Sequence, residues 1–363
     1  MPSERLLAAL LVGLLVLIIL PWRHSTRVTT AVPENETVIA AVDQTPTSPP
    51  GEGSETSDGG DPGQTEALEP APTERVEETQ VPEPTIPPTE APIEVSPTSD
   101  PALAVTGEYL LPAYRVLSFY GFPGEPNMGI LGEYDMQTLL ERLKQQAEAY
   151  QAVDDRPYKL AFEVIASVAQ QYEGEDGDHL AYIGEEQLQE YIDFTAANDL
   201  LLILDVQFGR RSVQQEVAAM EQYLEYPHVH LALDPEFAVD EGEVPGTVIG
   251  SIDAADVLYA QQELARISAE NGLPPKLLIV HQFTESSISN REQITQIPGV
   301  QFVLEVDGFG TPDEKRSTFA VLTAGEAFDF HGFKLWYNLQ DDPIMSPEEV
   351  LALDPQPDLI IYQ

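Results

Sequence analysis

Short apolar runs alternate with amphipathic stretches along the C-terminal two thirds of the chain. Between residues 102 and 363, the apolar runs have the length and composition of buried strands. They lie at residues 115–121, 159–166, 201–207, 229–236, 276–283, 301–308, 333–338 and 358–363. Stretches with helical periodicity separate most of them, at residues 135–153, 184–199, 212–225, 253–272 and 346–354. The links after the fifth and sixth runs are less clearly helical.

Eight strands that alternate with helices over roughly 260 residues predict an α/β fold, the (β/α)8 TIM barrel. An open, doubly wound sheet is the alternative. The count of eight and the absence of a glycine-rich phosphate loop favour the closed barrel. No helical pattern follows the eighth run, so we expect a barrel that lacks its last helix. Residues 103–112 are expected to cover the gap.

Successive residues of a strand point to opposite faces. In a barrel, the apolar set faces the helices and the alternate set faces the interior. This parity predicts an unusually polar interior, formed by Ser118, Tyr120, Glu163, Asp205, Gln207, His230, Asp234, Glu236, His281, Glu305, Asp307, Lys334, Trp336, Asn338 and Tyr362.

Most of these polar residues fall toward the C-terminal ends of the runs, where barrel enzymes place their active sites. Buried ionised groups are costly unless they are paired, so a set of this size indicates a function. Two members have plainer interpretations. Lys334 begins its run and is expected to form a low-lying ion pair with Glu305 or Glu163. His230 is expected to be a hydrogen-bonded core histidine.

The N-terminal part of the chain has a different character. Residues 6–22 form an uninterrupted apolar run, which predicts an uncleaved signal anchor within residues 1–27, with a cleaved signal peptide as the alternative. Residues 28–101 are rich in Pro, Thr, Glu and Ser and predict a disordered, acidic stalk. Residues 102–363 then form the barrel domain. This layout predicts a bacterial cell-surface protein with its domain outside the membrane; secretion is the alternative.

The charge of the chain restricts its partners. The formal net charge is −45, with only 17 Lys and Arg residues, so nucleic acid and anionic membrane surfaces are excluded as partners. Contact with the membrane is expected through the N-terminal helix alone. The chain has no cysteine, which excludes disulfides and thiol chemistry. We expect a monomer without a cofactor.

The fourth run ends in Asp234-Pro235-Glu236. Asp234 and Glu236 share a strand face, which places their Cβ atoms roughly 6–7 Å apart. Glycoside hydrolysis requires a carboxylic acid that protonates the leaving oxygen and a second group that stabilises or attacks the anomeric carbon. An anionic neighbour raises the pKa of the acid and keeps it protonated near neutrality. The pair therefore predicts a catalytic site.

With this motif the chain resembles the (β/α)8 glycoside hydrolases, especially the family 25 muramidases and the family 18 chitinases, whose fourth strand ends in Asp-x-Glu. The resemblance implies that Glu236 is the general acid. It also implies that Asp234 orients a substrate N-acetyl group that acts as the nucleophile. The chain differs from both families in Pro235, and its first run offers Ser118 and Tyr120 where the muramidases have an Asp.

Other inward residues are suited to contact a sugar, because aromatic faces stack on sugar rings while carboxylates and amides bind hydroxyls. The expected substrate-binding residues are Tyr120, Asp205, Gln207, His281, Asp307, Trp336, Asn338 and Tyr362. We therefore predict a surface-anchored barrel that hydrolyses a cell-wall or extracellular polysaccharide, with peptidoglycan glycan as one candidate. A non-catalytic glycan-binding barrel is an alternative.

A metal-dependent hydrolase is the third hypothesis. Its ligands would be His281, Asp205, Asp234, Glu236 and Asp307. The only H-x-H pattern, His228 and His230, lies at the start of its run, away from the expected site, and there is no H-E-x-x-H motif. We therefore expect no metal.

Overall fold

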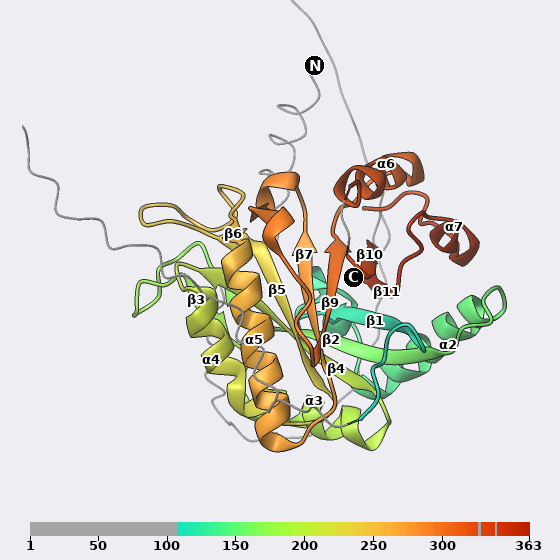
Figure 1. Cartoon of the computed structure of the whole chain (residues 1–363), viewed down its shortest axis with the longest axis horizontal. Helices are drawn as coiled ribbons and strands as arrows, with labels where there is room; N and C mark the ends of the chain where they lie inside the picture. The colour runs from blue at the N-terminus through green and yellow to red at the C-terminus, as the bar shows by residue number, and fades with distance from the viewer. Residues whose placement is uncertain (1–106, 326–327, 338–339) are drawn as a thin grey trace, which may run out of the picture. The chain divides into compact units, whose positions relative to one another are not determined.

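The computed structural model describes residues 107–325, 328–337 and 340–363. Eight parallel strands close into a barrel in the order β1, β11, β10, β9, β7, β5, β4, β2, and β2 pairs again with β1 (Figure 1). All eight predicted strands are present, as β1 (Arg115–Gly121), β2 (Tyr158–Ala169), β4 (Leu201–Gly209), β5 (Val229–Ala238), β7 (Lys276–Gln282), β9 (Val300–Val306), β10 (Phe330–Leu335) and β11 (Leu359–Tyr362). The predicted TIM barrel is confirmed.

The five predicted helices are confirmed as α2 (Met136–Gln151), α3 (Glu185–Ala197), α4 (Val213–Leu224), α5 (Ala254–Asn271) and α7 (Pro347–Leu351). A capping box at Ser212 begins α4, another at Asp253 begins α5, and the left-handed Gly272 follows the last residue of α5. These local signals fix the ends of the helices that carry the chain from one strand to the next.

The two links without a clear helical pattern differ from each other. After β9 the chain forms α6 (Pro312–Leu322), which begins with a capping box at Thr311 and Pro312 at its first position. After β7 the described chain has short elements only: the 3-10 turns η3 (Glu285–Ser287) and η4 (Arg291–Gln293), with β8 (Ile288–Ser289) between them. Strand β8 pairs with β6 (Ile252–Asp253), which joins this link to the start of α5.

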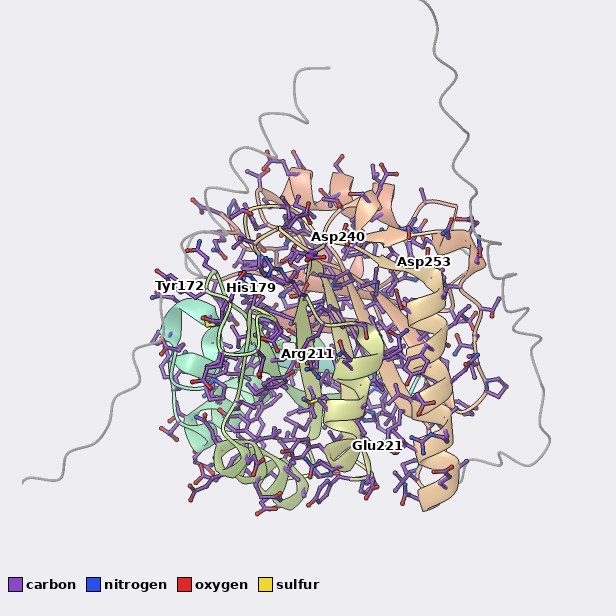
Figure 2. All side chains as sticks on the ribbon, turned by 90° about the vertical axis from the view of Figure 1, so that its left-hand side faces the viewer. Tyr172, His179, Arg211, Glu221, Asp240 and Asp253 are labelled. Carbon is purple, nitrogen blue, oxygen red and sulfur yellow. The ribbon has the colours of Figure 1, made fainter. Side chains whose placement is uncertain are left out.

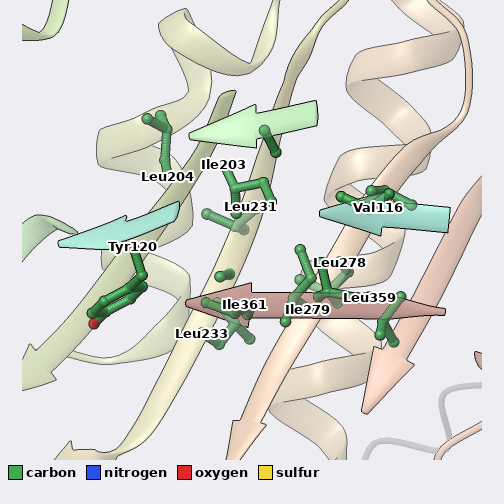
Figure 3. Packing of buried hydrophobic residues seen from close by; sticks show 14 of the residues in the cluster. Val116, Tyr120, Ile203, Leu204, Leu231, Leu233, Leu278, Ile279, Leu359 and Ile361 are labelled. Carbon is green, nitrogen blue, oxygen red and sulfur yellow. The ribbon is translucent and has the colours of Figure 1, made fainter. Parts of the chain in front are cut away.

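The strand register confirms the predicted parity in the strands other than β11. Tyr120 pairs with Glu163, Gln207 with Asp234, and His281 with Glu305, so these residues point to the same side of the sheet. The lower interior is apolar and is filled by Val116, Ile203, Ala232, Ile279, Val303, Leu359 and Ile361 (Figure 3). The polar residues lie above this apolar floor, toward the C-terminal mouth.

The described part of the segment before β1 bonds to the start of β9. Residues 103–106 of the expected cover lie outside the described chain, and the backbone N–H groups of Leu110 and Leu111 donate to Gln301 Oε1 at the start of β9. Helix α2 contacts β11 through Gln146 and Tyr150, which both bond to the Tyr362 hydroxyl. The gap is therefore covered in part by the first helix.

Strand β5 changes partner near the mouth of the barrel. Its pairing with β7 runs from Leu231 to Leu233 and stops there. Above this point Gly250 N–H donates to Glu236 O at 2.7 Å, and a Cβ on Gly250 would meet Ala238 O at 1.9 Å. The upper end of β5 is thus held by the loop that follows it.

A hairpin extends the wall on the other side of β5. Strand β3 (Leu180–Tyr182) pairs antiparallel with the upper end of β2. Arg210 forms an ion pair with Glu173 of the hairpin at 3.0 Å, and Arg211 forms one with Glu216 of α4 at 2.5 Å. Figure 2 shows this face of the molecule, with His179 of the hairpin and Arg211 labelled. These pairs fix the loops around one side of the mouth.

In the part of the chain that the structure describes, no helix is long and apolar enough to cross a membrane. The apolar run at residues 6–22 and the segment 28–101 lie outside the described residues. The signal anchor, the stalk and the predicted domain boundaries therefore stay predictions.

Candidate active site

A pocket opens at the C-terminal mouth of the barrel. Its aromatic wall consists of Tyr120, Phe237, Phe283, Phe309 and Trp336. Its polar side chains are Gln207, Asp234, Glu236, Asp307, Lys334, Gln340 and Gln363. The cavity lies where barrel enzymes bind their substrates, and it combines apolar walls with a few polar groups, as ligand pockets do.

Asp234 and Glu236 both line this cavity from β5. Asp234 is buried, and the Gln207 side-chain amide lies 3.5 Å from its Oδ2 atom. Burial, together with Glu236 and Asp205, holds the pKa of Asp234 well above its usual range. Burial and the nearby Asp307 raise the pKa of Glu236 to about 8. Glu236 is therefore a carboxylic acid that keeps its proton near neutrality.

A buried histidine network supports the floor of the cavity. His281 Nδ1 lies 2.7 Å from Glu305 Oε2, and His281 Nε2 lies 3.0 Å from Glu163 Oε1. Burial alone would lower the pKa of His281, but its hydrogen bonds to these two carboxylates outweigh that effect and hold the pKa well above its usual value. The ring is an imidazolium between two carboxylates.

Asp205 joins this network to the cavity wall. Its Oδ1 atom lies 3.7 Å from His281 Nε2, and its Oδ2 atom accepts a hydrogen bond from the Tyr120 hydroxyl at 2.7 Å. Burial raises the pKa of Asp205 to about 6. Asp205 and His281 were expected to contact substrate, but both are buried beneath the cavity and neither lines it. They position Tyr120, which does line it.

Lys334 lies higher than expected. Strand β10 begins at Phe330, three residues before the predicted run, so Lys334 reaches the mouth and forms an ion pair with Asp307 Oδ2 at 2.8 Å. Its ammonium lies 3.8 Å from the centre of the Tyr120 ring. The expected low ion pair of Lys334 with Glu305 or Glu163 is therefore wrong, since His281 takes that place between the two glutamates.

Tyr362 was expected to face the interior, and this is wrong. It pairs in register with Phe119, whose side chain faces the helices, and its hydroxyl lies 2.9 Å from the Tyr150 hydroxyl of α2. The next residue, Gln363, lines the cavity instead. Asn338, another expected sugar contact, lies outside the described residues.

The remaining predicted site residues are brought together. Tyr120, Gln207, Asp234, Glu236, Asp307 and Trp336 all line the cavity, although they come from different strands. His230 is a buried core histidine, as expected, and its Nδ1 atom accepts from Leu277 N–H at 3.1 Å. Sequence reasoning missed Lys334 and Gln363 as lining residues. Strand β9 pairs with β10, and β1 pairs with β11. The inward-facing positions of β9 and β1 would therefore have predicted that Lys334 and Gln363 face the cavity.

A clasp between two loops fixes the aromatic rim. Lys315 of α6 forms an ion pair with Asp341 at 3.0 Å and also donates to Gly308 O. Asp341 Oδ2 accepts from Trp336 N–H at 2.9 Å, and the Trp336 ring meets Phe309 edge-on at 5.9 Å. The Lys315–Asp341 clasp therefore holds the loops that present these two aromatic rings to the cavity.

The described residues contain one cluster with metal-ligand spacing. Ligand atoms of His281, Glu305 and Asp307 lie within 4.8 Å of one another. A metal-bound histidine needs a free ring nitrogen, but both nitrogens of His281 are within hydrogen-bond distance of carboxylates. An ion would have to displace one of these bonds. The donor set fits a buried ion-pair network better than a metal centre.

No protein-family model matches the chain, and no curated protein is similar to it. Among solved structures, the chain is similar to the crystal structure of a GH18 chitinase from Pseudoalteromonas aurantia. The sequence identity is 8% and the TM-score is 0.35, over 68% of this chain and 93% of that chain. We assign the fold from the strand pairing of the chain itself. The closed barrel agrees with the weak resemblance to (β/α)8 glycoside hydrolases in architecture.

Proposed function

We propose that the barrel is a glycoside hydrolase with Glu236 as the general acid and Asp234 as its helper. One observation carries the proposal: two neighbouring carboxyl groups with raised pKa values open onto an aromatic-walled cavity at the C-terminal mouth of a barrel. Near neutrality, burial and Asp307 favour the protonated form of Glu236, which a general acid requires.

In the proposed reaction, Glu236 donates its proton to the glycosidic oxygen as the bond between that oxygen and the anomeric carbon breaks. The developing positive charge at the sugar ring is stabilised by the carboxylate that Glu236 becomes, with Asp234 beside it on the same strand face. Water then supplies a hydroxyl group to the anomeric carbon, and its remaining proton restores Glu236. The net change is the addition of one water across one glycosidic bond.

The substrate and the location of the enzyme belong to the same proposal. The aromatic wall suits the faces of sugar rings, and Gln207, Gln340 and Gln363 offer amides to hydroxyl groups. We propose a polysaccharide of the cell wall or the extracellular matrix as substrate. The apolar run at residues 6–22 would anchor a monomeric enzyme at the bacterial surface, with its barrel outside.

The test is a screen of the full-length chain against purified polysaccharides and peptidoglycan, with the release of reducing ends as the readout. The Glu236→Gln variant should lose activity by at least about 100-fold, the lower end of what a general acid contributes. Glu241→Gln, on an exposed loop nearby, is the matched control and should keep full activity.

Full activity of Glu236→Gln would refute the assignment of the acid. Glycan binding that survives in both variants, with no turnover by the wild-type chain, would identify the barrel as a non-catalytic glycan-binding protein instead.

A further inference from the structure

Carboxyl groups outnumber cations in the upper interior of the barrel. Six acidic side chains point inward or end at the mouth: Glu163, Asp205, Asp234, Glu236, Glu305 and Asp307. In the described chain, two cations, His281 and Lys334, share this space with them. The proposed hydrolysis needs two of these carboxyl groups. Asp307 and Asp205 also serve that reaction by raising the pKa of Glu236, but neither role requires an unpaired oxygen on Asp307.

Asp307 lines the cavity and carries a buried oxygen that has no hydrogen-bond partner among the described residues. The residue is 3% exposed, and its Oδ2 atom bonds to Lys334. Its Oδ1 atom is that buried oxygen. A buried carboxylate oxygen without a donor is costly, and a ligand that brings a donor would satisfy it. This oxygen suits a cationic donor better than a neutral one, because a charge-assisted hydrogen bond to a carboxylate is the stronger of the two.

Aromatic rings line the same cavity as Asp307. Two of them, Phe309 and Trp336, meet edge-on. A carboxylate with aromatic faces beside it is a favourable environment for an ammonium group, since ring faces carry negative partial charge. Lys334 already uses this environment, with its ammonium close to the Tyr120 and Trp336 rings.

We propose that the cavity binds an amino sugar with a free amino group, whose ammonium is held by Asp307 Oδ1 and the rings of Phe309 and Trp336. This inference rests on the proposed glycan-processing function and names its substrate class, a polymer that contains de-N-acetylated hexosamine. The chain has a formal net charge of −45, which concentrates such a polycation around the protein. The same charge repels glycans that carry carboxylate or phosphate groups.

The ammonium also affects the proposed acid. After burial, Asp307 is the largest contribution that raises the pKa of Glu236. A ligand cation beside Asp307 offsets part of this effect and lowers the pKa of Glu236 from about 8 toward neutrality. Glu236 then becomes a stronger acid when this ligand is bound.

The test measures affinity separately from turnover. The Glu236→Gln form of the full-length chain is titrated by calorimetry at pH 6 with two chito-oligosaccharides of equal length, one fully N-acetylated and one fully de-N-acetylated. We expect the de-N-acetylated oligosaccharide to bind at least about tenfold more tightly, which is typical of one charge-assisted hydrogen bond. The preference should persist in high salt, because a buried pair is screened less than surface charges.

Two further variants of the Glu236→Gln form test which residues cause the preference for the de-N-acetylated oligosaccharide. Asp307→Asn should reduce the preference to less than about threefold, and Trp336→Leu should reduce it in part. Glu241→Gln, exposed on a loop, should leave it unchanged. Circular dichroism checks that each variant is folded, and if Asp307→Asn does not fold, Trp336→Leu alone decides.

Equal affinity for the two oligosaccharides would overturn the inference, even if the wild-type chain hydrolyses another glycan. A preference that disappears in high salt, or that survives both Asp307→Asn and Trp336→Leu, would also overturn it, because general surface charge would then be the cause. Failure of the proposed function is a separate result: tight binding of the de-N-acetylated oligosaccharide without turnover by the wild-type chain.

Discussion

Raising the pH from 6 to 8 should destabilise the folded barrel, and Glu236 should account for a measurable part of the loss. The pKa of Glu236 is about 8 in the folded chain, against 4.5 for the free side chain. Between these values the folded state binds a proton that the unfolded state has released. Stability therefore falls as the pH rises through this window. Below it both states are protonated, and above it both are ionised.

The size of this change in unfolding free energy follows from the loss of one proton by Glu236 in the folded chain. One pH unit corresponds to about 1.4 kcal/mol for each proton that distinguishes the two states. Because Glu236 is already half ionised at pH 8, the change from pH 6 to pH 8 is about 2.3 kcal/mol, and the partial exposure of Glu236 reduces this to about 2 kcal/mol. The raised pKa of Asp205, about 6, contributes mainly below pH 6 and hardly enters this range.

The assay is urea unfolding of the full-length chain at pH 6, 7 and 8. Glu236→Gln cannot ionise at this position, so its free energy of unfolding should fall by about 2 kcal/mol less than that of the wild type over this range. The exposed Glu241→Gln control should follow the wild type. Parallel pH profiles for the wild type and Glu236→Gln would refute the reasoning, as would a wild-type chain that gains stability toward pH 8.

Two further predictions concern the network below the cavity and the clasp at its rim. His281→Gln removes the cation between two buried glutamates. It should lower the free energy of unfolding at pH 6 by about 3–5 kcal/mol, as expected for a broken buried ion pair. A loss below about 1 kcal/mol, measured by urea unfolding, would argue against an imidazolium. Lys315→Met breaks the clasp with Asp341 and should shift the fluorescence emission of Trp336 to longer wavelength, measured with Trp22→Phe as background; unchanged emission would show that the clasp does not hold the ring.

The sequence was sufficient to predict the strands and most of the site. In a barrel strand, side chains alternate between the face toward the helices and the face toward the interior, so the sequence itself shows which residues face inward. In the runs around Asp205 and Asp234, polar residues alternate with apolar ones. Parity could therefore be assigned without knowledge of the neighbouring strands, and the register agrees with it. The five amphipathic helices were predictable for the same reason.

The errors fall where this alternation is absent. In β11, Leu359, Ile360 and Ile361 are all apolar, so the pattern cannot show which face Tyr362 occupies; pairing with β1 decides it. In β10, His331 and Gly332 interrupt the apolar run, so the predicted run begins three residues late and places Lys334 too low in the barrel.

The helix after β9 was not clearly predicted, because its composition weakens the helical pattern. Helix α6 contains many charged residues, and of its side chains Lys315, Phe319 and Leu322 are buried, so its apolar periodicity is weak. The capping box at Thr311 and Pro312 was the available signal. The histidine network could not be predicted either, because which buried carboxylates meet His281 depends on distances across the barrel that no single strand determines.

The change of partner at the top of β5 has a consequence for how such a protein can diversify. The end of β5 that carries Glu236 is bonded to Gly250 of its own loop rather than to β7. Insertions or substitutions between residues 239 and 249 can therefore alter the mouth and reposition the acid while the pairing lower in the barrel stays intact. Gly250 itself cannot accept a side chain, since the Ala238 backbone occupies that space. In descendants of this sequence, we expect substitutions that change substrate preference to fall between residues 239 and 249, and we expect Gly250 to stay unchanged.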